Sequence, residues 1–261
     1  MRAAVVVPNW NGRRWLDGLL ASLEAQTRPA AEVIVVDNGS TDGSLEWLAA
    51  RDGVRAIALG RNTGFAFAVS RGVEAAAPDA EAIALVNTDV VLAPDWLERA
   101  VGRLERDERL GAVATKMVLM RSPDVIDDAG DVLRRDGVAE QRGHGRSDGP
   151  RFSSPGEVFS ACGGAAVYRR SAFDGAGGLD ERLFAYLEDV DLGLRLRLAG
   201  FFDDRPAERT AEIPGAIGSH VGNLEELIQA ARSGEVDIIY ITFPMRAEGR
   251  IRDVLSQLGD T

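Results

Sequence analysis

The sequence predicts an α/β fold in which a mostly parallel sheet is flanked by helices. Over the first half of the 261-residue chain, short apolar runs alternate with amphipathic stretches. Each apolar run ends in polar or turn-forming residues, as a strand does when it leaves a sheet. Strands and helices that alternate at short intervals build a parallel sheet, because each helix crosses from one strand to the next.

Four strand–helix units are expected in the first 106 residues. Their helices carry apolar residues at helical spacing, and Pro94 stands where a proline starts a helix. The expected strands are 3–7, 33–36, 54–59 and the run that ends at Asn87, and the expected helices are 13–25, 45–50, 65–77 and 95–106.

The pattern changes after Leu110. Residues 113–120 predict a longer strand. Residues 121–155 are rich in Gly, Asp, Arg and Ser and predict a mobile loop or a hairpin over the site. The run 158–167 is apolar and glycine-rich, so its glycines permit close approach of a backbone or a ligand. Tight packing alone would also explain them.

Carboxylates stand where elements of this fold begin or end. Asp37 ends the second expected strand, Asp89 follows the fourth, and Glu188 and Asp189 come before a leucine-rich helix. Parallel strands end at one edge of a sheet, which is the usual ligand crevice, so we expect these groups to lie close together.

These carboxylates fit the chemistry of a nucleotide. Asp37 can accept hydrogen bonds from a nucleobase or ribose. A divalent ion at Asp89 can bridge two phosphates and neutralise the charge that grows as a diphosphate leaves. Asp189 can take the proton from an attacking hydroxyl. Each signal also has a structural explanation, since an Asx turn accounts for Asn87 to Asp89 and acidic residues in a first helical turn complement the helix dipole.

Composition limits the partners of the chain. The formal net charge of −11 argues against nucleic acid as the main partner and against purely electrostatic docking on anionic lipid. Cys162 is the single cysteine, which excludes an internal disulfide and indicates a reducing compartment. No apolar run reaches the length of a membrane span, and no signal-peptide core is present. We expect a cytoplasmic protein, for which peripheral contact with the inner face of the cell membrane is compatible.

Five segments in order resemble the inverting glycosyltransferases of family 2, most closely the bacterial rhamnosyltransferase-like members. The resemblance covers residues 1–201 and implies the GT-A fold, a nucleoside diphosphate sugar donor and a glycan or lipid-linked acceptor in surface polysaccharide synthesis. The segments are VVVPNWNG, VIVVDNGSTDGS, RNTGFAFAVSRG, LVNTDVVLAPDWL and GGLDERLFAYLEDVDLGLRLRLAG.

The resemblance assigns roles residue by residue. Asp89 is the ligand of Mg²⁺ or Mn²⁺ in a variant of the family's Asp-X-Asp motif, in which Asn87 replaces the first Asp. Metal binding therefore depends on Asp89, phosphate oxygens and water. Glu188 and Asp189 match the family's Glu-Asp pair, whose second member is the catalytic base. The residues implied to bind the nucleotide sugar are Pro8, Asn9, Asn11, Asp37 (at the base), Arg61, Asn62, Gly64, Asn87 and Thr88, and those expected to contact the acceptor are Cys162, Gly163 and Gly164.

The last sixty residues depart from this family. Residues 202–261 resemble part of the Rossmann-like cytoplasmic portion of undecaprenyl-phosphate glucose phosphotransferase-type proteins, on the segments GNLEELIQAARSGEVDIIYITFP and RAEGRIRDVLSQL. We expect a fusion joined near residues 199–201, with a helix, a buried strand at 238–243 and a second helix. The portion is incomplete, so sugar-phosphate transfer is not assigned to it. His220 is either the histidine of the glycosyltransferase pattern or a surface residue before a helix.

Two further functions fit the sequence. A nucleotide-sugar-binding module whose turnover was lost through the C-terminal exchange would keep the donor site. A nucleotidyltransferase can share the general fold, but it needs a glycine-rich basic loop near the N-terminus, and PNWNGRRW is a poor one.

Overall fold

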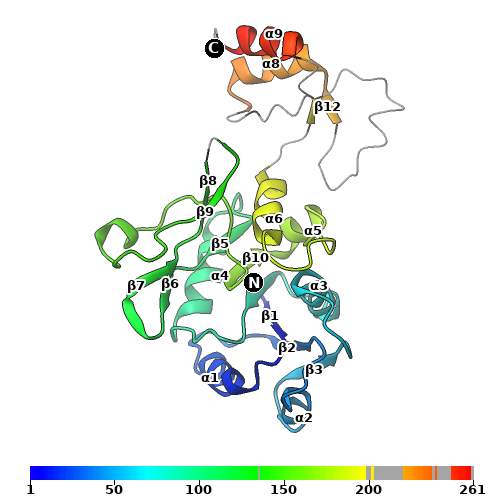
Figure 1. The fold of residues 1–261 in the computed structure, drawn as a ribbon, viewed down its shortest axis with the longest axis vertical. Helices are drawn as coiled ribbons and strands as arrows, with labels where there is room; N and C mark the ends of the chain where they lie inside the picture. The colour runs from blue at the N-terminus through cyan, green and yellow to red at the C-terminus, as the bar shows by residue number, and fades with distance from the viewer. Residues whose placement is uncertain (135, 198–200, 203–219, 237–238, 240–247, 260–261) are drawn as a thin grey trace. The chain divides into compact units, whose positions relative to one another are not determined.

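The computed structural model describes residues 1–134, 136–197, 201–202, 220–236, 239 and 248–259 (Figure 1). The chain divides into two compact units, Met1–Leu196 and Arg197–Thr261, and each is described by itself.

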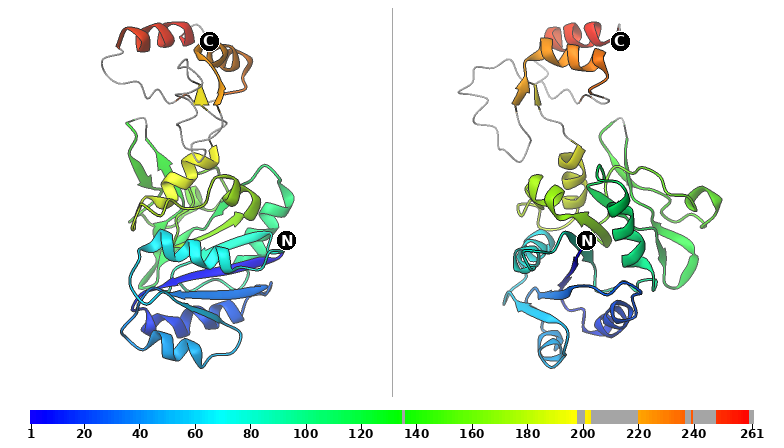
Figure 2. Two further views of the ribbon diagram at one scale, coloured as in Figure 1. Left: turned by 90° about the vertical axis from the view of Figure 1, so that its right-hand side faces the viewer. Right: turned by 180° about the vertical axis from the view of Figure 1, so that it is seen from behind.

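A six-stranded sheet forms the centre of the first unit (Figure 2). Its strand order is β3-β2-β1-β4-β10-β5. The first four strands in this order are parallel, whereas β10 runs antiparallel to both β4 and β5. The predicted mostly parallel α/β sheet is therefore confirmed. The strands are β1 (Ala3–Asn9), β2 (Glu32–Asp37), β3 (Arg55–Ala58), β4 (Ala82–Val86), β5 (Ala112–Ala114) and β10 (Ala165–Arg169).

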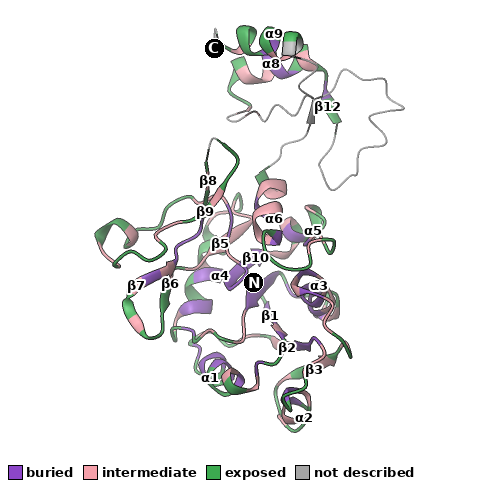
Figure 3. Ribbon diagram, in the orientation of Figure 1, coloured by how far each residue is buried: buried purple, intermediate pink, exposed green. Residues whose placement is uncertain are grey.

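Helices cover both faces of this sheet, and Figure 1 shows α1 and α3 on opposite sides of β1 and β2. Alternate residues of β1 point to the two faces, so Val5 and Val7 join the core with α1 and α4, while Val6 joins the core with α3. Strands β1, β4 and β10 are almost completely buried, which explains their continuous apolar runs, whereas the edge strands β3 and β5 are partly exposed (Figure 3). The helices are α1 (Arg13–Glu24), α2 (Ser44–Ala49), α3 (Phe65–Ala75), α4 (Trp96–Arg106), α5 (Arg170–Gly175) and α6 (Glu188–Arg197).

The single strand predicted at 113–120 is wrong. The chain leaves the main sheet after β5, and β6 (Met117–Leu119) pairs instead with β7 (Ser122–Asp128). Between the two strands, Thr115 accepts a hydrogen bond from the indole of Trp96 at 2.8 Å, and Lys116 pairs with Asp148 at 2.6 Å. These side-chain contacts accompany a turn of the backbone. The continuous apolar run therefore supplies β5 to the main sheet and β6 to the two-stranded sheet with β7.

The segment predicted as a loop or hairpin contains paired strands. Besides β7, it holds β8 (Asp131–Leu133), β9 (Ala139–Gln141) and a short 3-10 helix, η1 (Pro150–Phe152).

Pro94 also differs from its prediction, because α4 begins at Trp96 after the N-cap residue Asp95. Pro94 lies in the preceding turn, which the Trp96 amide closes by donating to the carbonyl of Ala93 at 3.0 Å.

The second unit contains β11 (Phe201–Phe202), β12 (His220–Gly222), α8 (Leu224–Ser233) and α9 (Glu248–Leu258). The start of α8 is a capping box, in which the Asn223 side chain accepts from the amide of Glu226 at 3.0 Å and the Glu226 carboxylate accepts from the amide of Asn223 at 2.7 Å. His220 is exposed, and both predicted helices are present. The strand predicted at 238–243 and the join at 199–201 lie largely outside the described residues. None of the helices within the described ranges has the length and apolar character to cross a membrane.

One close approach decides how α3 packs on the sheet. Gly72 lies over β1, where a methyl group added to it would overlap the side chain of Val6 and come within 3.1 Å of Cγ2 of Val36. We expect Gly72→Ala to destabilise the first unit by about 1–3 kcal/mol, because the added carbon overpacks the core.

The matched control for this substitution is Gly18→Ala. Gly18 is exposed within α1, and the nearest atom to its added carbon would be Cγ2 of Val91 at 3.8 Å. This change should stabilise by up to about 1 kcal/mol through helix propensity. Urea unfolding of both variants measures the difference, and equal stability of the two would contradict the close packing of α3.

Candidate active site

Two polar loops meet at the carboxyl ends of β1 and β2. Asn9 and Asp37 are paired across these strands and are almost completely buried, at 0% and 1% exposure. Asn9 Nδ2 donates to Asp37 Oδ2 at 2.8 Å and to Ser40 Oγ at 3.1 Å. The other Asp37 oxygen accepts from the Ser40 amide at 3.0 Å. The carboxylate predicted to meet a nucleobase is thus engaged within the loops and orders them.

Asn11 closes the same corner. Its backbone is left-handed (φ 53°), its amide donates to Ser40 Oγ at 2.9 Å, and its side-chain oxygen accepts from the Thr41 amide at 2.8 Å. Pro8 is the penultimate residue of β1 and is partly buried. The predicted donor-binding residues of this loop therefore lie together at the edge of the sheet.

Asn38 fastens the loop after β3 to the loop after β2. Its Oδ1 accepts from the amide of Thr63 at 2.8 Å, and its Nδ2 donates to the carbonyl of Gly64 at 3.0 Å. Asn62 Oδ1 accepts from the Gly64 amide at 3.0 Å, so this side chain shapes the loop itself. Arg61 is exposed beside them, with its backbone packed closely on Gly39.

Gly64 brings this loop against the segment that precedes α6. With φ at 91°, Gly64 adopts a backbone that other residues avoid, and an added carbon would overlap the carbonyl of Phe184. The next amide, that of Phe65, donates to the same carbonyl at 2.6 Å. Residues 64 and 184, far apart in sequence, are therefore neighbours.

The loop after β4 carries Asn87, Thr88 and Asp89. Thr88 packs on the first loop, because a carbon added to Gly12 would lie 2.9 Å from Thr88 Oγ1 and 2.5 Å from Asn9 Oδ1. Asp89 is exposed, and among the described residues its carboxylate has no hydrogen bond or ion pair. A free carboxylate of this kind suits Mg²⁺ or Mn²⁺, because such ions often bind through one or two carboxylates and take their other ligands from phosphate and water.

Asp189 occupies the first turn of α6, which begins at Glu188. Its Oδ2 accepts from the amide of Gly163 at 3.0 Å, and its Oδ1 accepts from the amide of Val190 at 2.8 Å. Glu188 is 5% exposed and its Oε2 is buried without a partner in the described structure. Burial, with a contribution from the charge of Asp189, raises the pKa of Glu188 above its ordinary value.

The residues immediately before α6 are strained and exposed. Tyr186 and Leu187 both have positive φ angles, 73° and 68°. Residues with side chains avoid this region, and such conformations concentrate at functional sites. Tyr186 is also 85% exposed, which is unusual for a large aromatic side chain.

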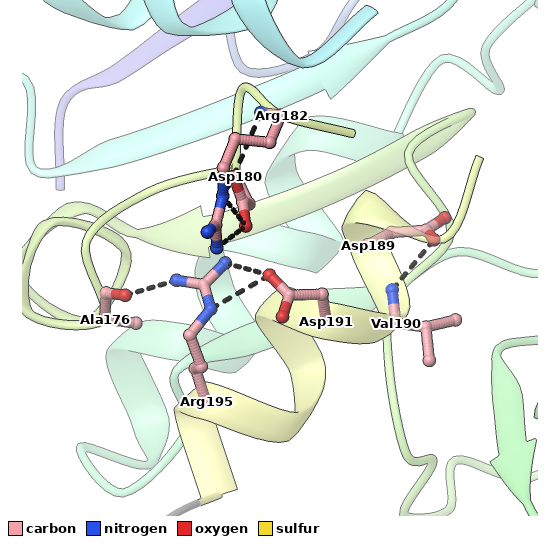
Figure 4. A network of polar contacts seen from close by, with 7 residues as sticks. All are labelled: Ala176, Asp180, Arg182, Asp189, Val190, Asp191 and Arg195. Atoms are coloured by element: carbon pink, nitrogen blue, oxygen red, sulfur yellow. Dashed lines mark hydrogen bonds and ion pairs between the residues drawn. The ribbon is translucent and has the colours of Figure 1, made fainter. Parts of the chain in front are cut away.

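An ion pair within α6 orients the Arg195 side chain, which reaches α5 (Figure 4). Asp191 Oδ2 accepts from Nε and Nη2 of Arg195 at 3.0 and 2.6 Å, and Arg195 Nη1 donates to the carbonyl of Ala176 at the end of α5. Nearby, the Arg182 guanidinium donates hydrogen bonds to Asp180 and lowers the pKa of that carboxyl to about 2. Of these contacts, the one between Arg195 and the Ala176 carbonyl ties α6 to the end of α5.

Two buried carboxylates beside Asp189 were not predicted. Asp128 is fully buried at the end of β7, where Oδ1 accepts from the Gly130 amide at 2.6 Å and Oδ2 has no partner among the described residues. Asp131 begins β8 and accepts from the Ser160 hydroxyl at 2.6 Å. The sign in the sequence that could have revealed Asp128 was the alternation of Ile126 and Asp128 at the two-residue spacing of a strand. The loop-like composition of the segment led to a different prediction.

These charges also act on Cys162. Burial, together with the charges of Asp128, Asp189 and Asp131, raises the pKa of its thiol to about 12. The thiol is therefore neutral at physiological pH and is not a nucleophile. Cys162 is half-buried, beside the two glycines that make the backbone contacts of the site.

The predicted site residues thus come together at one edge of the sheet. Gly163 and Gly164 connect its two carboxylate-bearing segments, because the Gly163 amide donates to Asp189 and the Gly164 carbonyl accepts from the Asn87 amide at 2.9 Å. A GT-A fold with carboxylates along the carboxyl edge of its parallel strands defines the class of protein.

The family follows from sequence comparison. The model of glycosyl transferase family 2 matches residues 4–176, and the model of a CoA-binding domain matches residues 167–261. The chain belongs to glycosyl transferase family 2. The second match fits the C-terminal resemblance, and the residues that both models share, 167–176, lie in β10, α5 and the residue that follows α5.

Known relatives support this assignment. N-acetylglucosaminyl-diphospho-decaprenol L-rhamnosyltransferase of Mycobacterium tuberculosis is 33% identical over 220 residues, which cover 76% of this chain and 71% of that protein. O-antigen biosynthesis protein RfbC of Myxococcus xanthus is 30% identical over 215 residues, covering 76% of this chain and 16% of RfbC.

Solved structures show the same fold at lower identity. S. aureus TarS 1-349 in complex with UDP aligns with a TM-score of 0.53 at 20% identity, covering 75% of this chain and 55% of that one. Mannosyltransferase PcManGT from Pyrobaculum calidifontis, in complex with GDP-Man and Mn²⁺, aligns with a TM-score of 0.55 at 19% identity, covering 92% and 66%. This chain therefore spans about half of the TarS fragment.

The buried Asp128 makes stability depend on pH. Burial, with the charges of Asp131, Asp127 and Asp189, raises its pKa from 3.8 to about 6. Between these values the folded protein binds a proton that the unfolded chain lacks, so this group's contribution to stability falls as pH rises through 6. We expect Asp128→Asn, which keeps the acceptor for Gly130, to stabilise the protein at pH of about 8 by up to about 3 kcal/mol and to have little effect at pH of about 4.

Thermal unfolding across this pH range measures the effect. Asp124→Asn is the matched control, because Asp124 is an exposed residue of the same strand. A stabilisation that does not change with pH would show that Asp128 does not titrate as described.

Proposed function

We propose that the protein is an inverting glycosyltransferase that moves a sugar from a nucleoside diphosphate sugar to an acceptor hydroxyl. The observation that carries this proposal is the pair of backbone contacts at Gly163 and Gly164. They bring the candidate base, Asp189, next to the loop of the candidate metal ligand, Asp89. A sugar between these two carboxylates would have a leaving diphosphate on one side and an attacking hydroxyl on the other.

The donor would lie along the loops after β1, β2, β3 and β4. Asn9, Asp37 and Asn38 are occupied in ordering these loops, so they prepare the donor site in advance. Arg61 is exposed at the rim and can approach phosphate oxygens. Asn9 Oδ1 is buried without a partner in the described structure, and Thr88 lies close to it.

Asp89 would hold Mg²⁺ or Mn²⁺, with the remaining ligands from the donor phosphates and water. The described residues contain no cluster of three or more His, Cys, Asp or Glu side chains that could hold a metal by themselves. When bound, the ion supplies electrostatic stabilisation of the leaving diphosphate.

Asp189 would accept the proton of the acceptor hydroxyl. As that oxygen bonds to the anomeric carbon, the bond from this carbon to the diphosphate oxygen breaks, and a single in-line displacement inverts the configuration. The Gly163 and Val190 amides each occupy one lone pair of the carboxylate and leave others to receive the proton. Cys162, Gly163 and Gly164 would line the acceptor side.

The relatives suggest the substrate class. One is an L-rhamnosyltransferase that acts on a polyprenyl-linked N-acetylglucosamine, and another is an O-antigen biosynthesis protein. We assign this chain, by analogy, to the assembly of a lipid-linked glycan or surface polysaccharide, in the cytoplasm and with peripheral contact at the inner face of the membrane. Residues 202–261 are taken as a partial Rossmann-like segment fused to the glycosyltransferase domain 1–201, without sugar-phosphate transfer of its own.

Loss of the metal ligand tests donor activation. With a panel of dTDP-, UDP- and GDP-sugars and Mn²⁺ or Mg²⁺, the wild-type protein should release nucleoside diphosphate from one donor. We expect Asp89→Ala to lower this rate at least about 100-fold, because charge on the departing diphosphate is no longer neutralised. Asp52→Asn, at an exposed residue outside the site, should leave the rate unchanged. Metal-dependent release by Asp89→Ala at the wild-type rate would contradict the role of Asp89.

Loss of the base tests the transfer step. Asp189→Asn keeps an acceptor for the Gly163 amide but cannot take a proton, so we expect kcat for transfer to fall about 10²–10⁴-fold while donor affinity is retained. Calorimetric titration of the donor and a transfer assay with a lipid-linked acceptor measure the two effects. Donor binding by the wild-type protein without hydrolysis or transfer under any condition would favour a nucleotide-sugar-binding module instead.

A further inference from the structure

A short strap, residues 159–163, lies between the predicted loop region and α6. At one end it contacts β8, and at the other it hydrogen bonds to Asp189. The strap contains no regular helix or strand, so its position depends on the side chains that fasten it. Those side chains come from residues that the proposed reaction does not use.

Asp131 fastens the strap to β8. The Ser160 hydroxyl donates to Asp131 Oδ2 at 2.6 Å, the Asp131 amide donates to the Ser160 carbonyl at 3.1 Å, and the Phe159 amide donates to the Asp131 carbonyl at 2.7 Å. Asp131 and Ser160 are both buried, at 5% and 4% exposure. A hydrogen bond to a buried charged group contributes more than an ordinary one, because water cannot replace it.

Tyr168 fastens the strap to the central sheet. It is a fully buried residue of β10, and its hydroxyl donates to the carbonyl of Ala161 at 3.0 Å. Neighbouring residues of the strap are thus tied in two directions, Ser160 to β8 and Ala161 to β10.

The strap contacts α6 at two points one helical turn apart. Gly163 donates its amide to Asp189, and Gly193 lies so close to Ser160 that an added carbon would overlap the Ser160 side chain and come within 3.0 Å of the Phe159 carbonyl. Residues four apart lie on the same face of a helix, so the strap lies along the face that carries Asp189.

We propose that Asp131 is a positioning residue that, through Ser160 and the strap, fixes the carboxylate of Asp189. This inference rests on the proposed function, because it assigns Asp131 to the geometry of that base. Displacement of a reacting group by about 1 Å can cost about 100-fold in rate, so a tie three residues from the Gly163 amide has a direct path to kcat. Asp131 itself lies behind the strap and is not a catalytic residue.

Three variants test the tie. Ser160→Ala removes one oxygen, Asp131→Leu keeps the branched shape with a larger side chain but removes both acceptors, and Asp131→Asn keeps one acceptor for Ser160. We expect Ser160→Ala and Asp131→Leu to lower kcat about 10–100-fold with the KM for the donor almost unchanged, while Asp131→Asn retains most of the activity. The double variant of Ser160→Ala and Asp131→Leu should be no worse than the poorer single one, because both remove the same contact.

Amide hydrogen exchange provides a readout that does not depend on turnover. In Ser160→Ala, exchange should accelerate at residues 163 and 188–193 and stay unchanged in β1 and α1, which the strap does not touch. A general loss of stability would accelerate exchange everywhere. If Asp131→Leu does not fold, Ser160→Ala and Asp131→Asn carry the same comparison.

The outcomes separate this proposal from the proposed function. An active wild-type protein whose kcat and exchange are unaffected by Ser160→Ala would overturn the positioning role and leave the glycosyltransferase intact. A wild-type protein that transfers no sugar would refute the proposed function, and local exchange at 188–193 would then decide alone whether the strap holds Asp189. Equal losses of kcat in Asp131→Asn and Asp131→Leu would show that the charge of Asp131, rather than its tie to Ser160, matters.

Discussion

The site depends on two hydrogen bonds made by consecutive glycines. The Gly163 amide donates to Asp189 on α6, and the Gly164 carbonyl accepts from Asn87 at the end of β4. Both positions are crowded, because a carbon added to Gly163 would lie 3.1 Å from the ring of Phe65 and one added to Gly164 would lie 3.2 Å from Cε of Met117. Two segments a hundred residues apart can meet here because these residues have no side chains.

Much of the remaining architecture orders polar loops around that contact. Asn9, Asp37 and Asn38 use their side chains to bind neighbouring loops, and such bonds are favourable when buried groups find partners. Three side chains, those of Asn9, Asp128 and Glu188, each have a buried oxygen without a hydrogen bond in the described structure, although Asn9 also donates through its amide nitrogen. Buried polar atoms without partners are costly, and these three lie around the proposed donor and acceptor regions, whereas those of Arg51, Arg71 and Asp148 lie elsewhere in the described structure.

The acidic character of the site has two different origins. Asp89 is exposed and without a partner in the described part of the chain, which suits an ion brought with the substrate. Asp128 and Asp131 are buried behind the strap, where burial raises the pKa of both carboxyls and the Ser160 hydrogen bond counteracts that rise at Asp131. In the proposed function, Asp89 therefore faces the substrate, while Asp128 and Asp131 belong to the supporting structure.

The sequence by itself determined the strand–helix order, because apolar periodicity and local turn chemistry are short-range properties. The family followed from the resemblance of five ordered motifs to its members. Tertiary structure decided the rest. It divided the apolar run at 113–120 between two sheets. It directed the Asp37 carboxylate to hydrogen bonds within the neighbouring loops. It also brought Asp128 and Asp131, from a segment with the composition of a loop, close to Asp189. Each of these outcomes depends on contacts between residues distant in sequence, which no local pattern encodes.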